Sequence, residues 1–401
     1  MVNEPSVVSI SPRERALMDR LVSLSSSSGS HSPSLATMQL EFPELEVEVD
    51  ACFLSNPLAT DLFWTHFNRD VLEDPQLFKR MLEAYPSQNR VIASDLSPAL
   101  GIDAGRLFIA NGATEAIQAI IQNFSSHVHI NVPTFSPYYE FAGPDRKVTR
   151  YQLDATESFA LDPVHYVQSV LRSGADTAVL ISPNNPDGYL IPDNDLAWIL
   201  GKLASVKTVI VDESFIHFAD RDSSGTKRFG ALPTLVGITE QFDNVTAVKS
   251  MSKDFGIAGI RAGYAIMDPA RVTRLLDQGY LWNSSGIAEY FFSLFGRPVF
   301  LDEYRKVLNT YRATIERFKT TMSGADFVRT YPTDANFQLM QMPLGVSADM
   351  VASLLLVRHG VYVRACGDKV GLDGEFIRVA IRTDSENSKV LAALKDVLSS
   401  I

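Results

Sequence analysis

The sequence predicts an α/β protein whose sheet is mostly parallel, followed by a smaller α+β domain. Two observations lead to this prediction. Between about residues 105 and 267, short runs of apolar and β-branched residues alternate with segments of helical length. Beyond about residue 297, a long amphipathic pattern is followed by short apolar runs and glycine-rich turns. Continuous apolar strands that alternate with helices are typical of a parallel sheet covered on both faces.

The strands of the large sheet are expected where apolar runs are bounded by turn residues. Five such runs are found, at 106–110, 127–132, 178–182, 208–212 and 245–249. Apolar residues at helical spacing predict helices between them, over 114–124 and 196–203. In sheets of this kind, functional groups gather at the carboxyl ends of the strands.

The C-terminal part has a different pattern. Apolar residues recur every three or four positions over 301–322, which predicts one long helix. A strand is expected over 336–342, a helix over 348–359, and a closing helix from about Glu386. Two further strands, 361–365 and 376–381, flank a segment with three glycines, which is typical of a hairpin.

Composition excludes several classes of protein. The 401 residues carry a formal net charge of −11 and no block of Lys or Arg, so nucleic acid is not an expected partner. No apolar run reaches the roughly 18 residues that a membrane span needs. Cys52 and Cys366 are the only cysteines, which argues against a disulfide scaffold and a structural zinc site and favours the cytoplasm. We expect no bound metal.

Four segments of the chain are expected to differ in role. Residues 1–45 form an N-terminal arm that is partly flexible, because 23–30 consist almost entirely of serine and glycine. Residues 46–75 join the arm to the small domain, and 76–297 form the large, cofactor-binding domain. The small domain is expected over 298–401.

Polar motifs follow four of the predicted strands. They are Asn-Gly-Ala-Thr-Glu at 111–115, Ser-Pro-Asn-Asn-Pro-Asp-Gly at 182–188, Asp-Glu-Ser-Phe at 212–215 and Ser-Met-Ser-Lys at 250–253. Each motif alone is a common turn. Their shared position at strand ends indicates one site.

These motifs describe an anion-binding cradle beside a reactive amine. Backbone amides at Gly112, Ala113 and Thr114 would open a helix, where a phosphate is favoured. Hydroxyl donors and a guanidinium are added by Ser250, Ser252 and Arg261.

Lys253 follows the two serines, where a desolvated amine of lowered pKa is suited to Schiff-base chemistry. Asp212 offers a fixed negative charge and Asn185 a neutral donor, which suit a ring nitrogen and a ring oxygen. A phosphate, an aldehyde, a ring nitrogen and a ring oxygen together indicate pyridoxal 5'-phosphate.

The sequence resembles the fold-type-I pyridoxal-phosphate enzymes of aminotransferase class I/II, over roughly residues 50–400. Within them it is most similar to histidinol-phosphate aminotransferase and threonine-phosphate decarboxylase. The resemblance implies that Lys253 forms the Schiff base, that Asp212 pairs with the pyridinium nitrogen, and that Asn185 binds the ring oxygen. The phosphate contacts that it implies are Ala113, Thr114, Ser250, Ser252 and Arg261.

The same resemblance implies further contacts. Phe135 would stack on the cofactor ring, with Tyr138 as the alternative for that role. Tyr85 would reach the phosphate of a neighbouring subunit, which implies a homodimer. The substrate-binding residues that it implies are Arg378 for the α-carboxylate, Arg364 for a distal acid or phosphate, and Asn56 at the substrate entrance.

Two positions depart from the family pattern. Phe215 stands where a tyrosine is common, so a hydroxyl near the ring oxygen is missing. Asp187 replaces a threonine in the Asn-Pro-Thr-Gly loop, which we interpret as a neutral exchange of capping residues.

The first hypothesis for the reaction is aminotransfer between an L-amino acid or phosphorylated amine and a 2-oxo acid, with Lys253 and Asp212 as catalytic residues. The alternative keeps the cofactor but predicts a decarboxylase, cyclase or oxidase of an amino acid. A second alternative is a regulator that binds the cofactor without catalysis. The fold permits all three, because only the groups placed around the substrate select the bond that breaks.

Overall fold

The computed structural model describes residues 10–27, 29, 31–219, 232, 234, 236–239 and 241–401. The chain divides into two compact units. Residues 55–312 form the large unit, and the small unit combines residues 1–54 with residues 313–401. These boundaries differ from the expected ones at 75/76 and 297/298. They differ because the helices that follow Asn56 belong to the large unit, and because α13 (Pro298–Ser323) runs through the second boundary without a break.

The large unit is built on a seven-stranded sheet with the order β2-β8-β7-β6-β5-β3-β4. Its strands are β2 (Leu107–Asn111), β3 (His127–Val132), β4 (Lys147–Gln152), β5 (Thr177–Ile181), β6 (Thr208–Asp212), β7 (Val245–Ser250) and β8 (Ala262–Ile266). The five expected strands lie within one residue of their predicted places. β4 and β8 were not predicted, because β4 is a polar edge strand and β8 is short and contains a glycine.

Only β8 runs against the other strands of this sheet, since it pairs antiparallel with both β2 and β7. The pairs β7–β6, β6–β5, β5–β3 and β3–β4 are parallel. The carboxyl ends of β2, β7, β6, β5 and β3 therefore lie at one edge of the sheet, as the alternation of strands and helices predicts.

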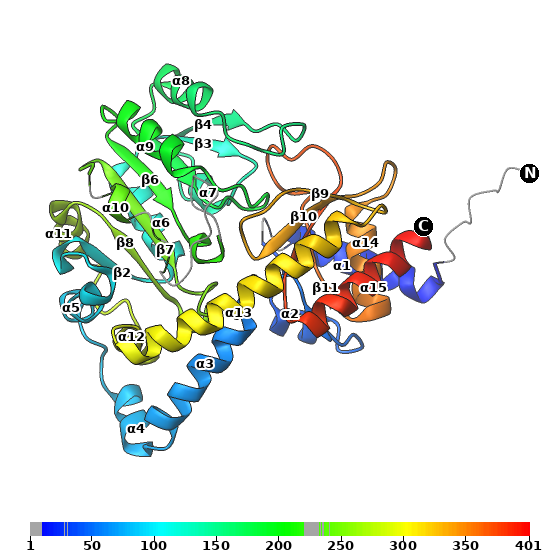
Figure 1. Ribbon diagram of the computed structural model, residues 1–401, viewed down its shortest axis with the longest axis horizontal. Coiled ribbons are helices and arrows are strands. Elements are labelled where there is room, and N and C mark those ends of the chain that lie inside the picture. Colours follow the sequence, from blue (N-terminus) through cyan, green and yellow to red (C-terminus); the bar gives the residue numbers. More distant parts are fainter. Residues whose placement is uncertain are drawn as a thin grey trace, which may run out of the picture. The chain divides into compact units, whose positions relative to one another are not determined.

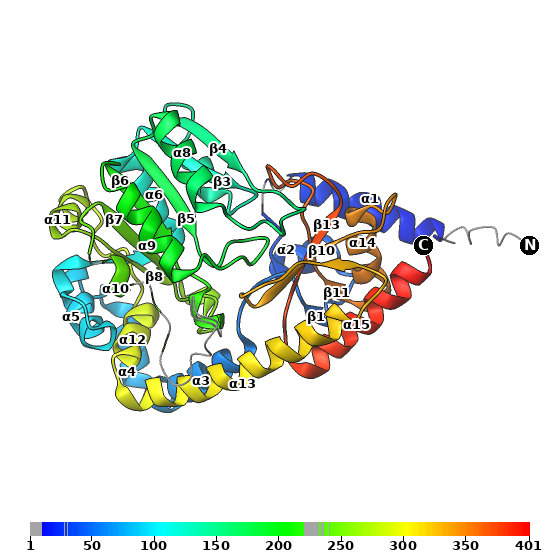
Figure 2. The same ribbon diagram turned by 45° about the horizontal axis from the view of Figure 1, so that its top comes forward.

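Helices cover the sheet on both faces, as Figure 2 shows for α6 (Ala113–Phe124) and α9 (Asp193–Lys202). The alternation of side chains along β3 explains the two layers. Val128 and Ile130 belong to the apolar core that includes the α6 side chains. His129 points to the opposite face, where its ring lies 5.8 Å from that of Tyr166 on α8 (Pro163–Ser173).

The remaining helices of the large unit surround this sheet (Figure 1). They are α3 (Pro57–Phe67), the π-helix η1 (Asn68–Leu72), α4 (Pro75–Glu83), α5 (Asn89–Leu100), α7 (Pro137–Glu140), α10 (Val236–Thr239), α11 (Pro269–Asp277) and α12 (Gly286–Phe295), with three 3₁₀ turns at η2 (Ala104–Arg106), η3 (Ile216–Phe218) and η4 (Ala258–Ile260).

The small unit contains a four-stranded antiparallel sheet with the order β12-β13-β10-β9 and a two-stranded parallel pair, β1–β11. The strands are β1 (Val49–Asp50), β9 (Arg329–Thr330), β10 (Phe337–Gln341), β11 (Val361–Tyr362), β12 (Arg364–Ala365) and β13 (Phe376–Ala380). Its helices are α1 (Pro12–Ser27), α2 (Leu35–Glu41), α14 (Ala348–His359) and α15 (Asp384–Ser399). The hairpin expected between 361 and 381 is formed by β12 and β13.

The N-terminal arm is an ordered part of the small unit over its described residues. Leu17 and Leu21 of α1 are buried in a cluster with Leu356 of α14. An ion pair of 2.7 Å joins Glu14 to Arg358 beside this contact. Residues 23–27 of the serine-rich run, expected to be flexible, form the end of α1, because apolar residues on the preceding turns hold the helix in place.

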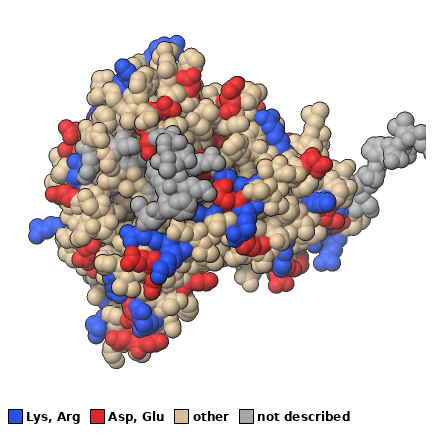
Figure 3. All heavy atoms as spheres, viewed as in Figure 1, with Lys and Arg blue, Asp and Glu red and all other residues tan. Residues whose placement is uncertain are grey.

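Among the described residues, no helix is both long and apolar enough to cross a membrane. On the face drawn in Figure 3, acidic side chains are interspersed with the Lys and Arg side chains.

Candidate active site

The strand register brings two of the sequence motifs, 111–115 and 250–253, together at one end of the sheet. Asn111 of β2 pairs with Ala262 of β8, and Ser250 of β7 pairs with Gly263 of β8. A Cβ atom on Gly263 would lie 2.5 Å from the backbone nitrogen of Ala113. The start of α6 therefore lies directly against the ends of β7 and β8.

Gly112 and Arg261 form the cradle at the start of α6. Gly112 has φ +78°, and a Cβ atom there would lie 2.5 Å from Nη2 of Arg261, so only glycine allows this approach. Arg261 itself takes the left-handed conformation, with φ +65°. The guanidinium thus stands beside the free amides of a helix N-terminus, which is a suitable place for a phosphate group.

The two serines of the lysine motif stand beside this cradle. Ser250 and Ser252 are both buried. The backbone N–H of Ser252 donates to the Ser250 hydroxyl at 3.3 Å, and the N–H of Ser250 donates to the Ser214 hydroxyl at 3.0 Å. These bonds fix the backbone between β7 and Lys253.

Asp212 ends β6 as a buried carboxylate with two donors. Its Oδ2 accepts the Tyr138 hydroxyl at 2.8 Å, and its Oδ1 accepts the backbone N–H of Ser214 at 2.8 Å. Burial raises the pKa of Asp212, although the bonds from Ser214 and Tyr138 oppose this rise. A cationic ring nitrogen is the partner that would offset the burial of this charge.

The loops after β3 and β5 are tied together next to Asp212. Asn184 accepts the Thr134 hydroxyl at 2.7 Å and donates to the Pro133 carbonyl at 3.0 Å. These bonds hold Asn185, which is buried, and Phe135, whose ring lies 6.5 Å from that of Tyr138. Tyr138 itself, the alternative for ring stacking, is fully buried and serves as a donor to Asp212.

Asp187 belongs to the same loop and is buried. Its Oδ1 accepts the backbone N–H of Tyr189 at 2.8 Å, and its Oδ2 accepts the Asn184 amide. Burial raises the pKa of Asp187 to about 7. A threonine carries no charge, so the exchange at this position adds a titratable group to the loop.

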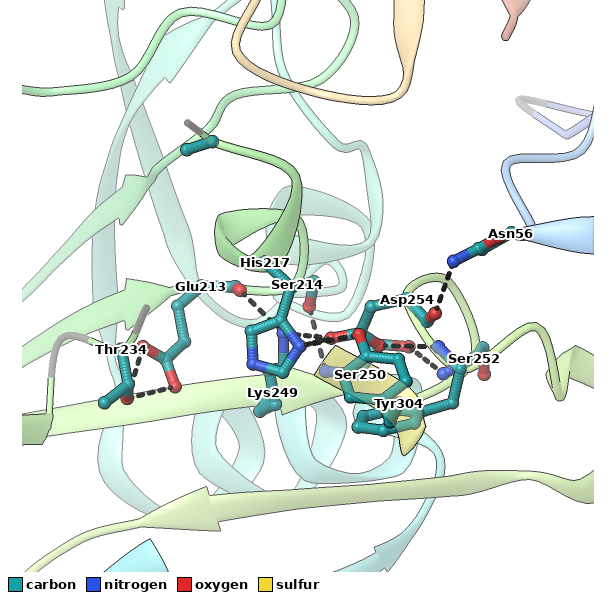
Figure 4. A network of polar contacts seen from close by, with 12 residues as sticks. Asn56, Glu213, Ser214, His217, Thr234, Lys249, Ser250, Ser252, Asp254 and Tyr304 are labelled. Atoms are coloured by element: carbon teal, nitrogen blue, oxygen red, sulfur yellow. Dashed lines mark hydrogen bonds and ion pairs between the residues drawn. The ribbon is translucent and has the colours of Figure 1, made fainter. Parts of the chain in front are cut away.

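Lys253 is half-buried on the turn after β7. Its carbonyl accepts the backbone N–H of Asn56 at 2.8 Å. The Asn56 side chain caps α3 by accepting the N–H groups of Leu58 and Ala59, and donates to the Asp254 carbonyl at 3.2 Å. Asn56 is fully buried, so its side chain here holds the lysine turn (Figure 4).

A buried charge network lies under this turn, and the sequence analysis did not predict it (Figure 4). Lys249 Nζ lies 2.6 Å from the Asp254 carboxylate, and His217 Nδ1 lies 2.8 Å from the same oxygen. The Tyr304 hydroxyl is 3.0 Å from His217 Nδ1. Asp254 has no exposed surface, and Lys249 and His217 are buried.

The protonation states of this network follow from the burial and from the ion pair. The ammonium of Lys249 and the neighbouring His217 hold the pKa of Asp254 below its ordinary value despite burial. Burial and Lys249 lower the pKa of His217 to about 4. The network is therefore a Lys249–Asp254 ion pair next to a neutral histidine, which leaves Lys253 as the lysine available for chemistry.

Tyr85 differs from the other expected site residues because its side chain is 84% exposed. Its ring lies 5.6 Å from that of Trp282, which is also exposed. Tyr85 lines a cavity of about 630 Å³ within the large unit, together with Arg80 and Glu289.

The two expected substrate arginines occur in the small unit. Arg364 of β12 is the register partner of Arg378 of β13. Nη2 of Arg364 lies 2.5 Å from the Asp368 carboxylate, while Nη2 of Arg378 donates to the Cys52 carbonyl at 3.0 Å. Burial lowers the pKa of Arg378.

The signals for the residues that sequence reasoning missed were present but weak. Lys249 is a charged residue inside an otherwise apolar run, with an acid five positions later. Tyr138 reaches Asp212 across 74 positions of the sequence, and only the fold brings the two side chains together.

The chain is similar to known proteins over most of its length. Residues 85–394 match the family described as aminotransferase class I and II. The chain is 43% identical to the L-serine phosphate decarboxylase of Campylobacter jejuni, over 98% of this chain and 99% of that protein. A solved structure of a decarboxylase from Sulfurospirillum multivorans matches with a TM-score of 0.91 and 39% identity, covering 97% of this chain and 98% of that one.

A more distant structure shares the fold and holds the expected cofactor. The histidinol-phosphate aminotransferase of Sinorhizobium meliloti, in complex with pyridoxal 5'-phosphate, matches with a TM-score of 0.67 and 18% identity, covering 98% of this chain and 99% of that one. The predicted fold class, a mostly parallel sheet covered by helices with a smaller α+β part, is confirmed, as is the resemblance to this family.

The expectation of aminotransfer is wrong. The relatives that match nearly the whole chain at about 40% identity are decarboxylases. The motifs at the strand ends do not distinguish the two reactions, because the contacts that they would make to the cofactor are common to every reaction of the fold.

The residues at the strand ends fit pyridoxal 5'-phosphate. The cradle formed by Gly112 and Arg261 suits its phosphate, and the buried carboxylate of Asp212 calls for a cationic partner such as its ring nitrogen. Lys253 is the lysine on the turn after β7 at this end of the sheet, whereas the side chain of Lys249 is held by Asp254.

Proposed function

Because the chain belongs to the aminotransferase class I and II family, we propose that it is a pyridoxal-phosphate-dependent decarboxylase of L-serine phosphate. One observation carries this proposal: the chain matches an L-serine phosphate decarboxylase from end to end, at 43% identity. The cofactor is pyridoxal 5'-phosphate, as the sequence predicts. The products would be CO₂ and phosphoethanolamine.

In this proposal the large unit binds the cofactor. Its phosphate contacts would be Gly112, Ala113, Thr114, Ser250, Ser252 and Arg261. Phe135 would stack on the ring and Asn185 would donate to the ring oxygen. Asp212 would keep the ring nitrogen protonated, since an opposite charge nearby favours the cationic form.

When bound, the cofactor supplies an electron-withdrawing ring that stabilises negative charge at the substrate Cα. Lys253 would hold the cofactor covalently before the substrate amine replaces it. The bond from Cα to the carboxylate breaks, CO₂ leaves, and its electron pair remains at Cα until a proton is added. Lys253, once released and protonated, is the group of this chain that would deliver this proton.

The substrate's anionic groups need cations. Arg378 is proposed to bind the α-carboxylate and Arg364 the phosphate, whereas the buried Asn56 caps α3 and is assigned no substrate contact. The register pairing of Arg364 on β12 with Arg378 on β13 supports this, because like charges opposite each other in a sheet are unfavourable unless an anion joins them.

The test is an assay of the purified holoenzyme with L-serine phosphate, following CO₂ and phosphoethanolamine together. We expect both products in equal amounts and without a 2-oxo acid. The matched control is Lys253→Ala, which should release neither. Conversion of the cofactor to pyridoxamine phosphate without CO₂ would contradict the proposal.

We also propose that the enzyme is a homodimer. The exposed pair Tyr85 and Trp282 supports this, because two large aromatic rings on a surface are typical of an interface. In this arrangement Tyr85 would bind the cofactor phosphate of the partner subunit. Sedimentation of the holoenzyme tests this: a fully active monomer would contradict the role of Tyr85. The cytoplasmic location remains part of the proposal and rests on the two unpaired cysteines.

A further inference from the structure

A third cation lies in the β12–β13 hairpin that carries Arg364 and Arg378. Lys369 occupies the segment between the two strands, and its backbone is fixed by two turn hydrogen bonds. Its N–H donates to the Cys366 carbonyl at 3.0 Å, and its carbonyl accepts the Leu372 N–H at 3.1 Å. The residue is only 8% exposed, like Arg364. Lysines are rarely buried to this extent without a partner.

The buried cations of this hairpin exceed its buried acids. Arg364 and Lys369 are buried, whereas the acids of the same segment, Asp368, Asp373 and Glu375, are exposed. The Asp368 carboxylate lies 2.5 Å from Arg364. Burial lowers the pKa of Lys369, and the guanidiniums of Arg364 and Arg378 lower it further against the opposing effect of Asp368. The buried thiol of Cys366 lies within the field of all three cations. Such a surplus of buried positive charge costs stability, and it marks a place where an anion binds.

The proposed substrate has two anionic groups of unequal charge. Its α-carboxylate carries one negative charge and is assigned to Arg378. Its phosphate carries about 1.5 to 2 negative charges at neutral pH. Arg364 alone does not match that charge, because Asp368 already compensates its guanidinium. A second cation is required at the phosphate, and Lys369 is the buried cation of the same hairpin.

We propose that Lys369 is a specificity-determining residue that binds the substrate phosphate together with Arg364. This inference rests on the proposed function and deepens it, since it states how a dianionic phosphate monoester is distinguished from a monoanionic side chain. A carboxylate carries a single negative charge, so one arginine that is already paired with an acid would be enough to bind it. A phosphate monoester needs the additional charge of Lys369.

The experiment compares three variants of the holoenzyme. Lys369→Met removes the charge at similar length, and Lys369→Arg keeps it. Lys395→Met is the matched control, because Lys395 is an exposed lysine of α15 in the same unit. For Lys369→Met we expect the KM for L-serine phosphate to rise about 10- to 100-fold, the loss of one charge-assisted hydrogen bond. The kcat should stay within about threefold, and Lys369→Arg should restore most of the KM.

A second measurement is independent of activity. Inorganic phosphate should raise the melting temperature of the wild-type holoenzyme and raise that of Lys369→Met much less. Without phosphate, Lys369→Met should be at least as stable as the wild type, because it removes a buried cation that has no acid of its own. A lysine with a purely structural role would give the opposite sign. Lys395→Met should behave as the wild type in both measurements.

Unchanged KM and unchanged phosphate stabilisation in Lys369→Met would overturn the inference. So would a loss that affects kcat and melting temperature together and is not restored by arginine. If Lys369→Met fails to fold, Lys369→Gln replaces it, and failure of both neutral variants would also overturn the inference. If the wild type releases no CO₂ from L-serine phosphate, the proposed function fails, and the phosphate stabilisation alone decides the role of Lys369.

Discussion

The charged groups under Lys253 and those of the β12–β13 hairpin are organised differently. In the large unit, Lys249 has Asp254 at 2.6 Å, and Asp212 has two hydrogen-bond donors. In the small unit, Asp368 forms an ion pair with Arg364, while Lys369 and Arg378 are two further cations of the same hairpin. Buried charges that are paired hold the neighbouring backbone in place. A surplus of buried positive charge is instead stabilised when an anion binds. In the proposed function, the first region would position the cofactor and the second would receive the substrate.

The strongest test of this comparison changes Lys253, which lies four residues after Lys249. Lys253→Ala should lower the rate of CO₂ release by at least about 10³-fold, because it removes both the covalent anchor and the proton donor. Borohydride reduction of the wild type should fix the cofactor to Lys253, as peptide mapping would show. An adduct on Lys249 would contradict the separation between a structural and a reactive lysine.

Asp212→Asn should produce the next largest effect. The change removes the charge that keeps the ring nitrogen protonated, and a shift of one to three pKa units corresponds to about a 10- to 1000-fold fall in kcat. The cofactor should remain bound, because its phosphate cradle is unchanged. Absorbance of the bound cofactor measures its retention, and loss of the cofactor with unchanged kcat per bound site would assign Asp212 to binding alone.

Asp254→Asn tests whether the buried pair is structural. It leaves the Lys249 ammonium in the interior without a counter-charge, which should lower the free energy of unfolding by about 3–5 kcal/mol. The double variant Lys249→Met with Asp254→Leu removes both charges and should be less destabilised than the single variant. Denaturant unfolding of both holoenzymes decides the matter. An equally damaged double variant would mean that packing, not charge, determines stability here.

Arg378→Ala tests the substrate side of the comparison. Loss of a desolvated carboxylate contact of about 2–4 kcal/mol should raise the KM for L-serine phosphate about 30- to 1000-fold. Inhibition by phosphoethanolamine should change little, because this product has no α-carboxylate. Equal weakening of substrate and product would place Arg378 at the phosphate instead.

The smallest expected effect concerns the half-buried ion pair of Glu14 and Arg358, which joins α1 to α14. Hydrogen bonds from Arg358 and Ser11 lower the pKa of Glu14 to about 2. A carboxylate whose pKa is lowered by folding stabilises the native state above its ordinary pKa, and this contribution is lost as the pH falls towards about 2. Glu14→Gln should therefore cost about 0.2–1 kcal/mol at pH 7 and nothing near pH 2. Urea unfolding at both pH values checks this.

The reaction itself was the point at which sequence reasoning failed. The motifs that contain Asn185, Asp212 and Lys253 predicted the cofactor, and that prediction is confirmed at the level of the family. They did not distinguish decarboxylation from aminotransfer, because both reactions begin with the same cofactor contacts. The full-length similarity to decarboxylases made that distinction.

The sequence by itself determined five strands of the large sheet, the long helix α13 and the polar motifs at the strand ends, because apolar periodicity and turn residues act between near neighbours. Only the tertiary structure decided that Tyr138 donates to Asp212 across 74 positions and that Tyr304 lies beside His217 across 87. It also decided that α1 packs on α14. Contacts between residues this far apart depend on how buried surfaces meet, and no local pattern in the chain records that.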